Sequence, residues 1–424
     1  MTSLALIGGK PVFSTKHSWP QWPMASRADE RKVLEVVRSG EWGIGSSHTR
    51  QFAEAFAQNQ QVKHVLPVAN GTAALELVIR ALDIGEGDEV IVPSYTFVAT
   101  ATAVLQTDAT VIFADIDPRT FNMDPAHVAK LITKRTKAIV TVHFAGNPCA
   151  MAALLTLGKK WGIPVIEDAA HAHGMLYRGK PAGGLGLAGC FSFQSSKNMA
   201  SGEGGAITTN DPKLFERAQS FHSFGRKLGR QWYEHHYLAC NERLSGLQSA
   251  LLLGQLERLE AQTRQRYANA MFLDGRLSEI AGQHPQEPGD LHPRTRRAHH
   301  IYMWRYDART TGIPRDLFLA ALKAEGVAAI PGYPMPLQDN IMFRNRRFWH
   351  WQYLGGKPRR AGEPDYRHME TPVAKKLCAE SIMLTQNMLL GPRQDMQGIV
   401  DAVAKVLAQR DVLLAHARTQ NNLK

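Results

Sequence analysis

Hydrophobic and polar residues follow two alternating patterns between about residues 60 and 210. Short, almost continuous apolar runs are separated by stretches in which hydrophobic residues recur every three or four positions. The apolar runs lie at 90–92, 111–114, 138–142 and 164–168. Such runs are typical of strands buried on both faces of a sheet, whereas the longer spacing predicts helices. The pattern therefore predicts a mostly parallel sheet, with helices at about 72–83, 96–105, 125–133 and 150–161.

After about residue 240 the apolar runs and helical patterns lie farther apart in the sequence. The elements predicted there are a helix at 247–259, a strand at 300–305, a helix at 315–325 and a terminal helix at about 395–415. A proline-rich segment, 331–336, precedes a basic loop, 343–366, which contains Trp349 and Trp351. We expect an α/β protein with a large, mostly parallel-sheet domain over 1–260 and a smaller α+β domain over 261–424.

The amino-acid composition excludes several classes of protein. The 424 residues are 44% hydrophobic and 21% charged, which excludes a disordered chain, a collagen and a disulfide-stapled mini-protein. No stretch of about 18 apolar residues occurs, so no membrane-spanning helix is expected. The four cysteines form no Cys-x-x-Cys pair, and the first residues lack a basic start followed by an apolar stretch. We expect a cytoplasmic protein without a membrane partner.

The net charge of +12, from 50 basic and 38 acidic residues, raises the question of nucleic-acid binding. The basic residues are spread along the chain, and the denser patches belong to no nucleic-acid-binding motif. Those patches lie at 226–230, 294–297 and 344–347. We interpret the excess as surface charge that supports solubility, and we expect no nucleic-acid partner.

The residues that follow each apolar run are the candidates for chemistry, because ligands of open α/β sheets bind at the carboxyl ends of strands. Gly71 and Thr72 open a predicted helix after one such run. Backbone N–H groups at a helix start, together with the threonine hydroxyl, suit a phosphate group. The alternative is an ordinary helix cap formed by Asn70 or Thr72.

The second candidate, segment 167–174, begins with an acidic pair at the end of a strongly apolar run. A partly buried carboxylate at this place, such as that of Asp168, needs a cationic partner. His171 and His173 allow two interpretations: metal ligands together with Asp168, or hydrogen-bonded histidines at a helix cap. No second cluster of ligands accompanies them, so no metal is expected.

The third candidate is Lys197, the one lysine of segment 191–205, between a serine-rich turn and a glycine-rich loop. Most lysines lie at the surface, but a lysine held in a pocket loses its proton and forms an imine with a carbonyl compound. The three candidates together supply what pyridoxal phosphate needs. The helix start anchors the phosphate, Asp168 pairs with the pyridine nitrogen, and Lys197 supplies the amine for the aldehyde.

The motifs around these residues resemble those of the DegT/DnrJ/EryC1/StrS family, pyridoxal-phosphate-dependent aminotransferases that act on keto-sugars and cyclitols. The resemblance runs from residue 19 to the final helix and is densest over 70–205. The matching segments are 70–74, 93–97, 142–146, 167–171, the Lys197 segment with 202–205, 241–244, 248–250 and 254–256.

By this resemblance the fold is aminotransferase fold type I, and the active unit is a homodimer with shared active sites. Lys197 is the Schiff-base lysine. Asp168 pairs with the protonated pyridine nitrogen, which keeps the ring an electron sink. His171 is placed near the ring and its 3-hydroxyl. The implied catalytic residues are Lys197, Asp168 and His171.

The resemblance also implies which further residues bind the cofactor. Phe97 matches the aromatic residue that stacks on the ring. Asn241 matches the residue that reaches the phosphate in the neighbouring subunit. The implied phosphate contacts within the chain are Gly71, Thr72 and Ser192, with Gln194 close by.

Segments 6–11, 19–23 and 192–194 are most similar to two subgroups. The cyclitol (inosose) aminotransferases imply ping-pong transfer of an amino group from glutamine or glutamate to a keto-cyclitol or keto-sugar, in an antibiotic-type pathway. The 3-amino-5-hydroxybenzoate synthase-like proteins imply elimination of water to give an aromatic amine. A non-catalytic accessory member is a third interpretation. Lys197 argues against the dehydrating members that carry histidine at this position.

Gly246 departs from the family pattern, which has glutamate there, and this leaves the substrate open. The candidates to line the substrate pocket are Trp42, His143, Arg226 and Tyr333. For each of them the alternative is an ordinary structural or surface role. The basic loop 343–366 matches no family segment and is expected to be a solvated loop; the alternative is a loop that closes over an anionic substrate.

Overall fold

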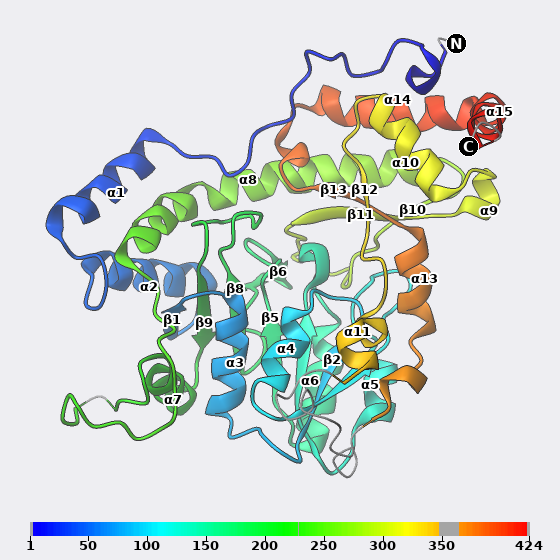
Figure 1. Ribbon diagram of the computed structural model, residues 1–424. Helices are drawn as coiled ribbons and strands as arrows, with labels where there is room; N and C mark the ends of the chain where they lie inside the picture. The colour runs from blue at the N-terminus through cyan, green and yellow to red at the C-terminus, as the bar shows by residue number, and fades with distance from the viewer. Residues whose placement is uncertain (1–2, 228, 347–363, 422–424) are drawn as a thin grey trace.

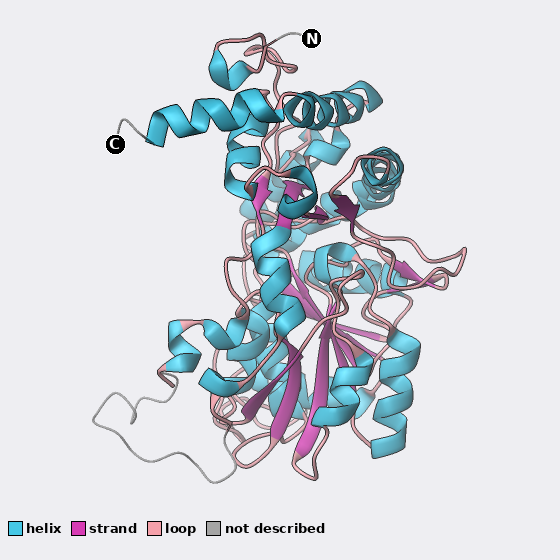
Figure 2. Ribbon diagram, turned by 90° about the vertical axis from the view of Figure 1, so that its right-hand side faces the viewer, coloured by secondary structure: helices cyan, strands magenta, loops and turns pink. Residues whose placement is uncertain are grey.

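The computed structural model describes residues 3–227, 229–346 and 364–421. Within them a seven-stranded sheet and a four-stranded sheet lie one above the other (Figure 1). Helices cover both faces of the large sheet (Figure 2). The predicted α/β class with a mostly parallel sheet is therefore confirmed.

The large sheet has the strand order β1-β9-β8-β5-β4-β2-β3. Of these strands only β9 runs antiparallel to its neighbours, β8 and β1. The other pairings are parallel, as the apolar runs predicted. The strands are β1 (His64–Val68), β2 (Glu89–Pro93), β3 (Thr110–Ala114), β4 (Thr136–Val142), β5 (Val165–Asp168), β8 (Ala188–Ser192) and β9 (Gly205–Thr209).

The helices predicted between these strands are all present. Their starts follow from capping: the Asn70 side chain accepts from the Ala73 amide at 2.9 Å, and Asp124 caps the helix in which Pro125 comes first. The helices around the large sheet are α1 (Arg27–Ser39), α2 (Ser47–Gln60), α3 (Gly71–Ala81), α4 (Ala99–Leu105), α5 (Pro125–Leu131), α6 (Met151–Trp161) and α7 (Pro212–His222).

The smaller sheet is antiparallel, with the order β10-β11-β13-β12. Its strands are β10 (Gln283–Pro285), β11 (Ile301–Tyr306), β12 (Ile330–Pro331) and β13 (Ser381–Thr385). The helices in this part of the chain are α9 (Ala308–Thr311), α10 (Arg315–Ala324), α11 (Ile341–Arg344), α13 (Pro372–Glu380), α14 (Arg393–Ala408) and α15 (Arg410–Asn421). The predicted terminal helix is thus two helices, which meet at Gln409.

Short elements complete the described chain. The strands β6 (Leu176–Tyr177) and β7 (Lys180–Pro181) form a small hairpin sheet. The 3-10 helices are η1 (Ala5–Ile7), η2 (Phe144–Gly146), η3 (Leu337–Asp339), η4 (Tyr366–His368) and η5 (Met388–Leu390).

Helix α8 (Gly246–Ser278) corrects the helix predicted over 247–259, because it continues for 19 residues beyond that end (278 minus 259). Buried polar residues in its second half, Thr263, Arg266 and Asn269, break the apolar stripe on which the prediction relied. The division proposed at residue 260 falls within this helix and stays a prediction. The first half of α8 packs in a hydrophobic core with α2 and strands β1, β8 and β9 of the large sheet. Its second half packs in the hydrophobic core of the small sheet.

Two loops stand out. Residues 223–227 and 229–243, called the loop 223–243 below, project from the body of the molecule after α7 (Figure 1) and expose Trp232, Tyr233 and Leu238. Most of the basic loop 343–366, including Trp349 and Trp351, lies outside the described residues. No helix in the described ranges is long and apolar enough to cross a membrane.

Candidate active site

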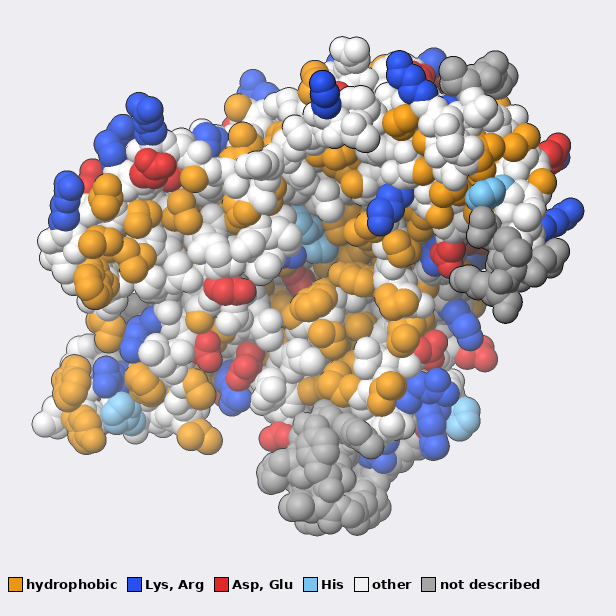
Figure 3. Space-filling model, turned by 45° about the horizontal axis from the view of Figure 1, so that its top comes forward, with side chains coloured by type: hydrophobic (Ala, Val, Ile, Leu, Met, Phe, Trp, Pro, Cys, Tyr) orange, Lys and Arg blue, Asp and Glu red, His pale blue; other side chains and the backbone are white. Residues whose placement is uncertain are grey.

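A cavity of about 1140 Å³ opens between the carboxyl ends of the large sheet's strands and the small sheet. The hollow in the middle of Figure 3 holds histidine and charged side chains among hydrophobic ones. Its walls come from the ends of β5 and β8, the start of α3 and the residues that end β13. This is the place at which ligands of open α/β sheets bind.

The start of α3 forms one end of the cavity. Asn70 caps the helix, which leaves the Gly71 and Thr72 amides without a hydrogen-bond partner among the described residues. A Cβ added to Gly71 would lie 2.8 Å from Cβ of Ser192, so glycine is needed for this close approach of α3 to β8. The two free amides at a helix start, beside the Ser192 hydroxyl, suit a phosphate group.

Asp168 ends β5 at the floor of the cavity and is 5% exposed. Oγ1 of Thr100 donates to its Oδ2 at 2.8 Å, and the Ala170 amide donates to its Oδ1 at 3.2 Å. Burial raises the pKa of this carboxyl, although the two hydrogen bonds and the charge of Lys197 oppose the shift. No cation of the described residues lies within 4 Å of it, so the carboxylate has room for a positively charged N–H group from a ligand.

Lys197 follows β8 and lines the same cavity. Its amide donates to the Gln194 carbonyl at 2.9 Å, and its carbonyl accepts from Nε1 of Trp22 at 3.1 Å. Burial lowers the pKa of the Lys197 amine to about 8, while the charge of Asp168 opposes the shift. The amine is therefore ready to react with a carbonyl compound near neutral pH.

Two histidine rings, tilted by 39° to each other, lie in contact on the wall of the cavity. The Ala145 amide donates to Nδ1 of His171 at 3.2 Å, so the proton of the neutral ring lies on Nε2. Burial lowers the pKa of His171 well below its usual range, which keeps the ring neutral. The ring of His300 lies 4.3 Å from it, centroid to centroid. His171 can thus donate a hydrogen bond at the cavity wall without carrying charge.

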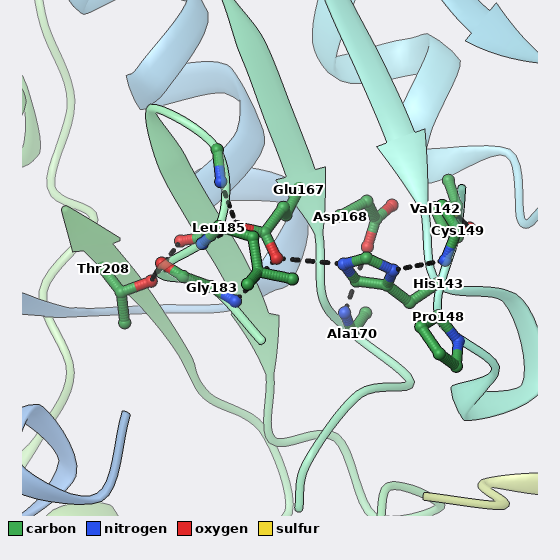
Figure 4. Close-up of polar contacts among 12 residues, drawn as sticks. Val142, His143, Pro148, Cys149, Glu167, Asp168, Ala170, Gly183, Leu185 and Thr208 are labelled. Atoms are coloured by element: carbon green, nitrogen blue, oxygen red, sulfur yellow. Dashed lines mark hydrogen bonds and ion pairs between the residues drawn. The ribbon is translucent and has the colours of Figure 1, made fainter. Parts of the chain in front are cut away.

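His143, a candidate for the substrate pocket, does not line the cavity. Figure 4 shows it between Glu167 and Cys149, and it is not among the residues that line the cavity. Its Nε2 lies 3.0 Å from Oε2 of Glu167, and its Nδ1 accepts from the Cys149 amide at 3.1 Å. Glu167 also accepts from three backbone amides of residues 183–186. His143 is therefore part of a buried structural network.

The structure brings most of the predicted site residues together. Those that line the cavity are Gly71, Thr72, Phe97, Asp168, His171, Ser192, Gln194, Lys197 and Tyr333. The Phe97 ring is 58% exposed, so one face is free for a ligand. The predicted residues that lie outside the cavity are Asn241, Trp42, Arg226 and, as described above, His143. Asn241 is exposed in the projecting loop 223–243, and Trp42 is exposed beyond the end of α1.

The sequence analysis did not single out several residues that line the cavity, among them Trp22, Thr100, His300 and Gln386. Thr100 lies four residues after Thr96 at the start of a predicted helix, and this spacing is the signal for a hydroxyl facing the sheet. His300 begins a predicted strand. Gln386 directly follows β13 of the small antiparallel sheet, and no sequence pattern marked it.

These residues fit pyridoxal phosphate. The free amides of α3 suit its phosphate, the buried Asp168 carboxylate suits a protonated pyridine nitrogen, and the Lys197 amine suits its aldehyde. The exposed face of Phe97 is available to the ring. This chemistry agrees with what the sequence motifs imply.

Comparison with known proteins gives the same assignment. The model of the DegT/DnrJ/EryC1/StrS aminotransferase family matches residues 24–400. An L-glutamine:2-deoxy-scyllo-inosose aminotransferase of Streptomyces lividus is 39% identical, over 96% of this chain and 97% of the relative. An L-glutamine:scyllo-inosose aminotransferase of Streptomyces griseus is 36% identical, over 96% and 98% of the two chains.

The structure is similar to solved structures of the same family. The crystal structure of 3-amino-5-hydroxybenzoic acid synthase superposes with a TM-score of 0.82 at 31% identity and covers 92% of this chain and 99% of that one. The fold, the residues of the cavity and the family match over residues 24–400 all give the same family assignment. The chain therefore belongs to the DegT/DnrJ/EryC1/StrS aminotransferase family and is a pyridoxal-phosphate-dependent aminotransferase.

Proposed function

We propose that this enzyme moves an amino group from glutamine or glutamate to a keto-cyclitol or keto-sugar by a ping-pong mechanism. The observation that carries the proposal is the cavity in which Lys197, Asp168 and the free amides of α3 meet. The substrate class is supported by relatives at 35–39% identity that are named glutamine:inosose aminotransferases. Aminoglycoside-type biosynthesis is the corresponding kind of pathway.

Pyridoxal phosphate supplies an aldehyde that condenses with amines and a ring that withdraws electrons from the carbon next to nitrogen. Lys197, with its lowered pKa, moves a proton between the donor's Cα and C4′ of the cofactor. Asp168 holds the proton on the pyridine nitrogen, since Thr100 and the Ala170 amide fix its carboxylate. His171, whose Nδ1 is occupied by the Ala145 amide, would have its Nε2 proton available for the 3-hydroxyl of the bound cofactor.

The active unit in this proposal is a homodimer. Asn241 lies outside the cavity of its own chain and is exposed in the projecting loop 223–243, as a residue that serves a neighbouring subunit must be. The exposed Trp232, Tyr233 and Leu238 of the same loop give it an apolar surface for that contact. We place the enzyme in the cytoplasm, where the four free cysteines stay reduced.

The first experiment is an absorbance spectrum of the purified holoenzyme before and after addition of L-glutamine or L-glutamate. The expected result is a visible band that one of the two donors bleaches, followed by its return when a keto-cyclitol is added. A band that neither donor changes would contradict the proposed donor class. Lys197→Ala should keep the fold and lose both the band and turnover.

A second candidate function is supported by the similarity to 3-amino-5-hydroxybenzoic acid synthase. In that function the enzyme eliminates water from a cyclic keto substrate and forms an aromatic amine. Both functions need Lys197, so product analysis decides between them. An amino-cyclitol product supports transamination, whereas an ultraviolet-absorbing aromatic product without consumption of a donor supports elimination.

A further inference from the structure

Gln386 lines the cavity directly after β13 and is only 3% exposed. Nε of Arg266 donates to its side-chain oxygen at 2.8 Å. A guanidinium has donors only, so the oxygen of the amide, and not its nitrogen, must face Arg266. No described residue accepts a hydrogen bond from Nε2 of Gln386. The Gln386 amide thus presents an unused N–H₂ donor at the cavity wall.

Arg266 places a positive charge directly behind this amide. Its side chain is 0% exposed in α8, and no carboxylate of the described residues lies within 4 Å of it. Nη1 and Nη2 make no hydrogen bond to the described residues, and the guanidinium lies 5.0 Å from the Trp22 ring. Burial lowers its pKa to about 9, so it stays charged at neutral pH.

Within the described residues of this one chain, no other side chain supplies a fixed cation to the cavity. Among the described lining residues the only lysine or arginine is Lys197, and that amine is already used for the proton transfer at the donor's Cα. A neutral hydroxyl would gain little from a buried guanidinium nearby, whereas an anion would gain Coulomb energy in this poorly screened place. The ligand group that best fits the N–H₂ donor of Gln386, with the Arg266 guanidinium behind it, is a carboxylate.

We propose that Gln386 binds a carboxylate of the amino-acid donor and that Arg266 is a positioning residue, which orients the amide and supplies the charge behind it. The proposal rests on the proposed function, since it concerns the donor of that reaction. It predicts that Gln386 serves the half-reaction with glutamine or glutamate and not the half-reaction with the keto acceptor. Trp22 links this place to the reacting amine, because Nε1 of Trp22 donates to the Lys197 carbonyl.

The test measures the two half-reactions separately in the holoenzyme. For Gln386→Leu we expect the KM of the donor to rise at least tenfold, while the rate constant and KM of the keto-acceptor half-reaction change less than twofold. Gln386→Glu should raise the donor KM further, since the introduced carboxylate repels that of the donor. Gln265→Leu is the matched control: Gln265 lies in α8 next to Arg266 and donates to the Leu390 carbonyl, but it does not line the cavity.

Calorimetric titration of the holoenzyme with glutarate, a dicarboxylate without an amine, tests the site without turnover. Gln386→Leu should weaken glutarate binding at least tenfold, and Arg266→Gln should do so with an unchanged maximal rate for the donor half-reaction. Unchanged glutarate affinity in Gln386→Leu, or equal losses in both half-reactions, would overturn the inference. A wild-type enzyme that binds glutarate through Gln386 but does not transaminate would count against the proposed function alone.

Discussion

The titration of Lys197 gives a quantitative test of the site. Burial lowers the pKa of its amine from 10.5 to about 8, even though Asp168 opposes the shift. At pH 7 about 10% of the amine is then neutral, against about 0.03% for an unperturbed lysine, a difference of roughly 300-fold. Because the neutral amine is the nucleophile, cofactor-free protein should capture pyridoxal phosphate at Lys197 much faster than surface lysines do.

The assay is the rate of appearance of the visible band when pyridoxal phosphate is added to cofactor-free protein between pH 6 and pH 10. The rate should rise through a midpoint near the pKa of about 8 and then level off. Asp168→Asn removes the charge that keeps this pKa up, so its midpoint should move to lower pH. Asp401→Asn, at an exposed carboxylate on α14, should leave the midpoint unchanged.

Stability should follow the same titration in the cofactor-free protein. The unfolded chain binds more protons at Lys197 than the folded chain does between the folded pKa of about 8 and the unfolded value of 10.5. This group's contribution to the free energy of unfolding therefore rises with pH across that window and is constant below it. A capture midpoint near 10.5 would refute the burial of the amine, and an Asp168→Asn midpoint equal to that of wild type would refute the interaction of the two charges.

Three further substitutions test a close approach in the site and two buried polar contacts elsewhere at the large sheet. Gly71→Ala, whose Cβ would lie 2.8 Å from that of Ser192, should weaken pyridoxal phosphate binding about tenfold in an equilibrium titration, whereas the control Gly275→Ala, with open space around it, should not. Glu167→Gln should lower the free energy of urea unfolding by about 3 kcal/mol, because every group around this buried carboxylate is a donor; a loss below 1 kcal/mol would contradict that network. Tyr366→Phe removes a hydroxyl that donates to a carbonyl of β3 at 3.0 Å and should cost about 1 kcal/mol in the same assay, with no change in turnover.

The sequence predicts the large sheet well because its strands are buried on both faces, and burial of this kind leaves a continuous apolar run. Segment 205–209 gives no signal of its direction, so the reversed strand β9 could not be foreseen. The length of α8 was missed because the polar residues that it buries, Arg266 among them, look like exposed positions in the sequence.

Some residues of the site could likewise be predicted from the local sequence, and others could not. Lys197 and Asp168 stand beside strand ends and glycine-rich turns, which mark them locally. The roles of Gln386 and Arg266 depend on a contact between side chains 120 residues apart, and no local pattern records such a contact. His143 was a candidate for the substrate pocket because it follows a strand end. Its ring is instead buried, where it is hydrogen-bonded to the Cys149 amide and to Glu167.

The continuous helix α8 also sets a mechanical limit. Its 33 residues span about 50 Å. Its first half is buried in a hydrophobic core of the large sheet, and its second half is buried in the hydrophobic core of the small sheet. A hinge between the two sheets would have to bend this rod in its middle, where Leu259 and Thr263 are buried. Substrate entry must therefore rely on movement of loops at the cavity rim, and crystal structures with and without substrate should superpose over both sheets as one rigid body.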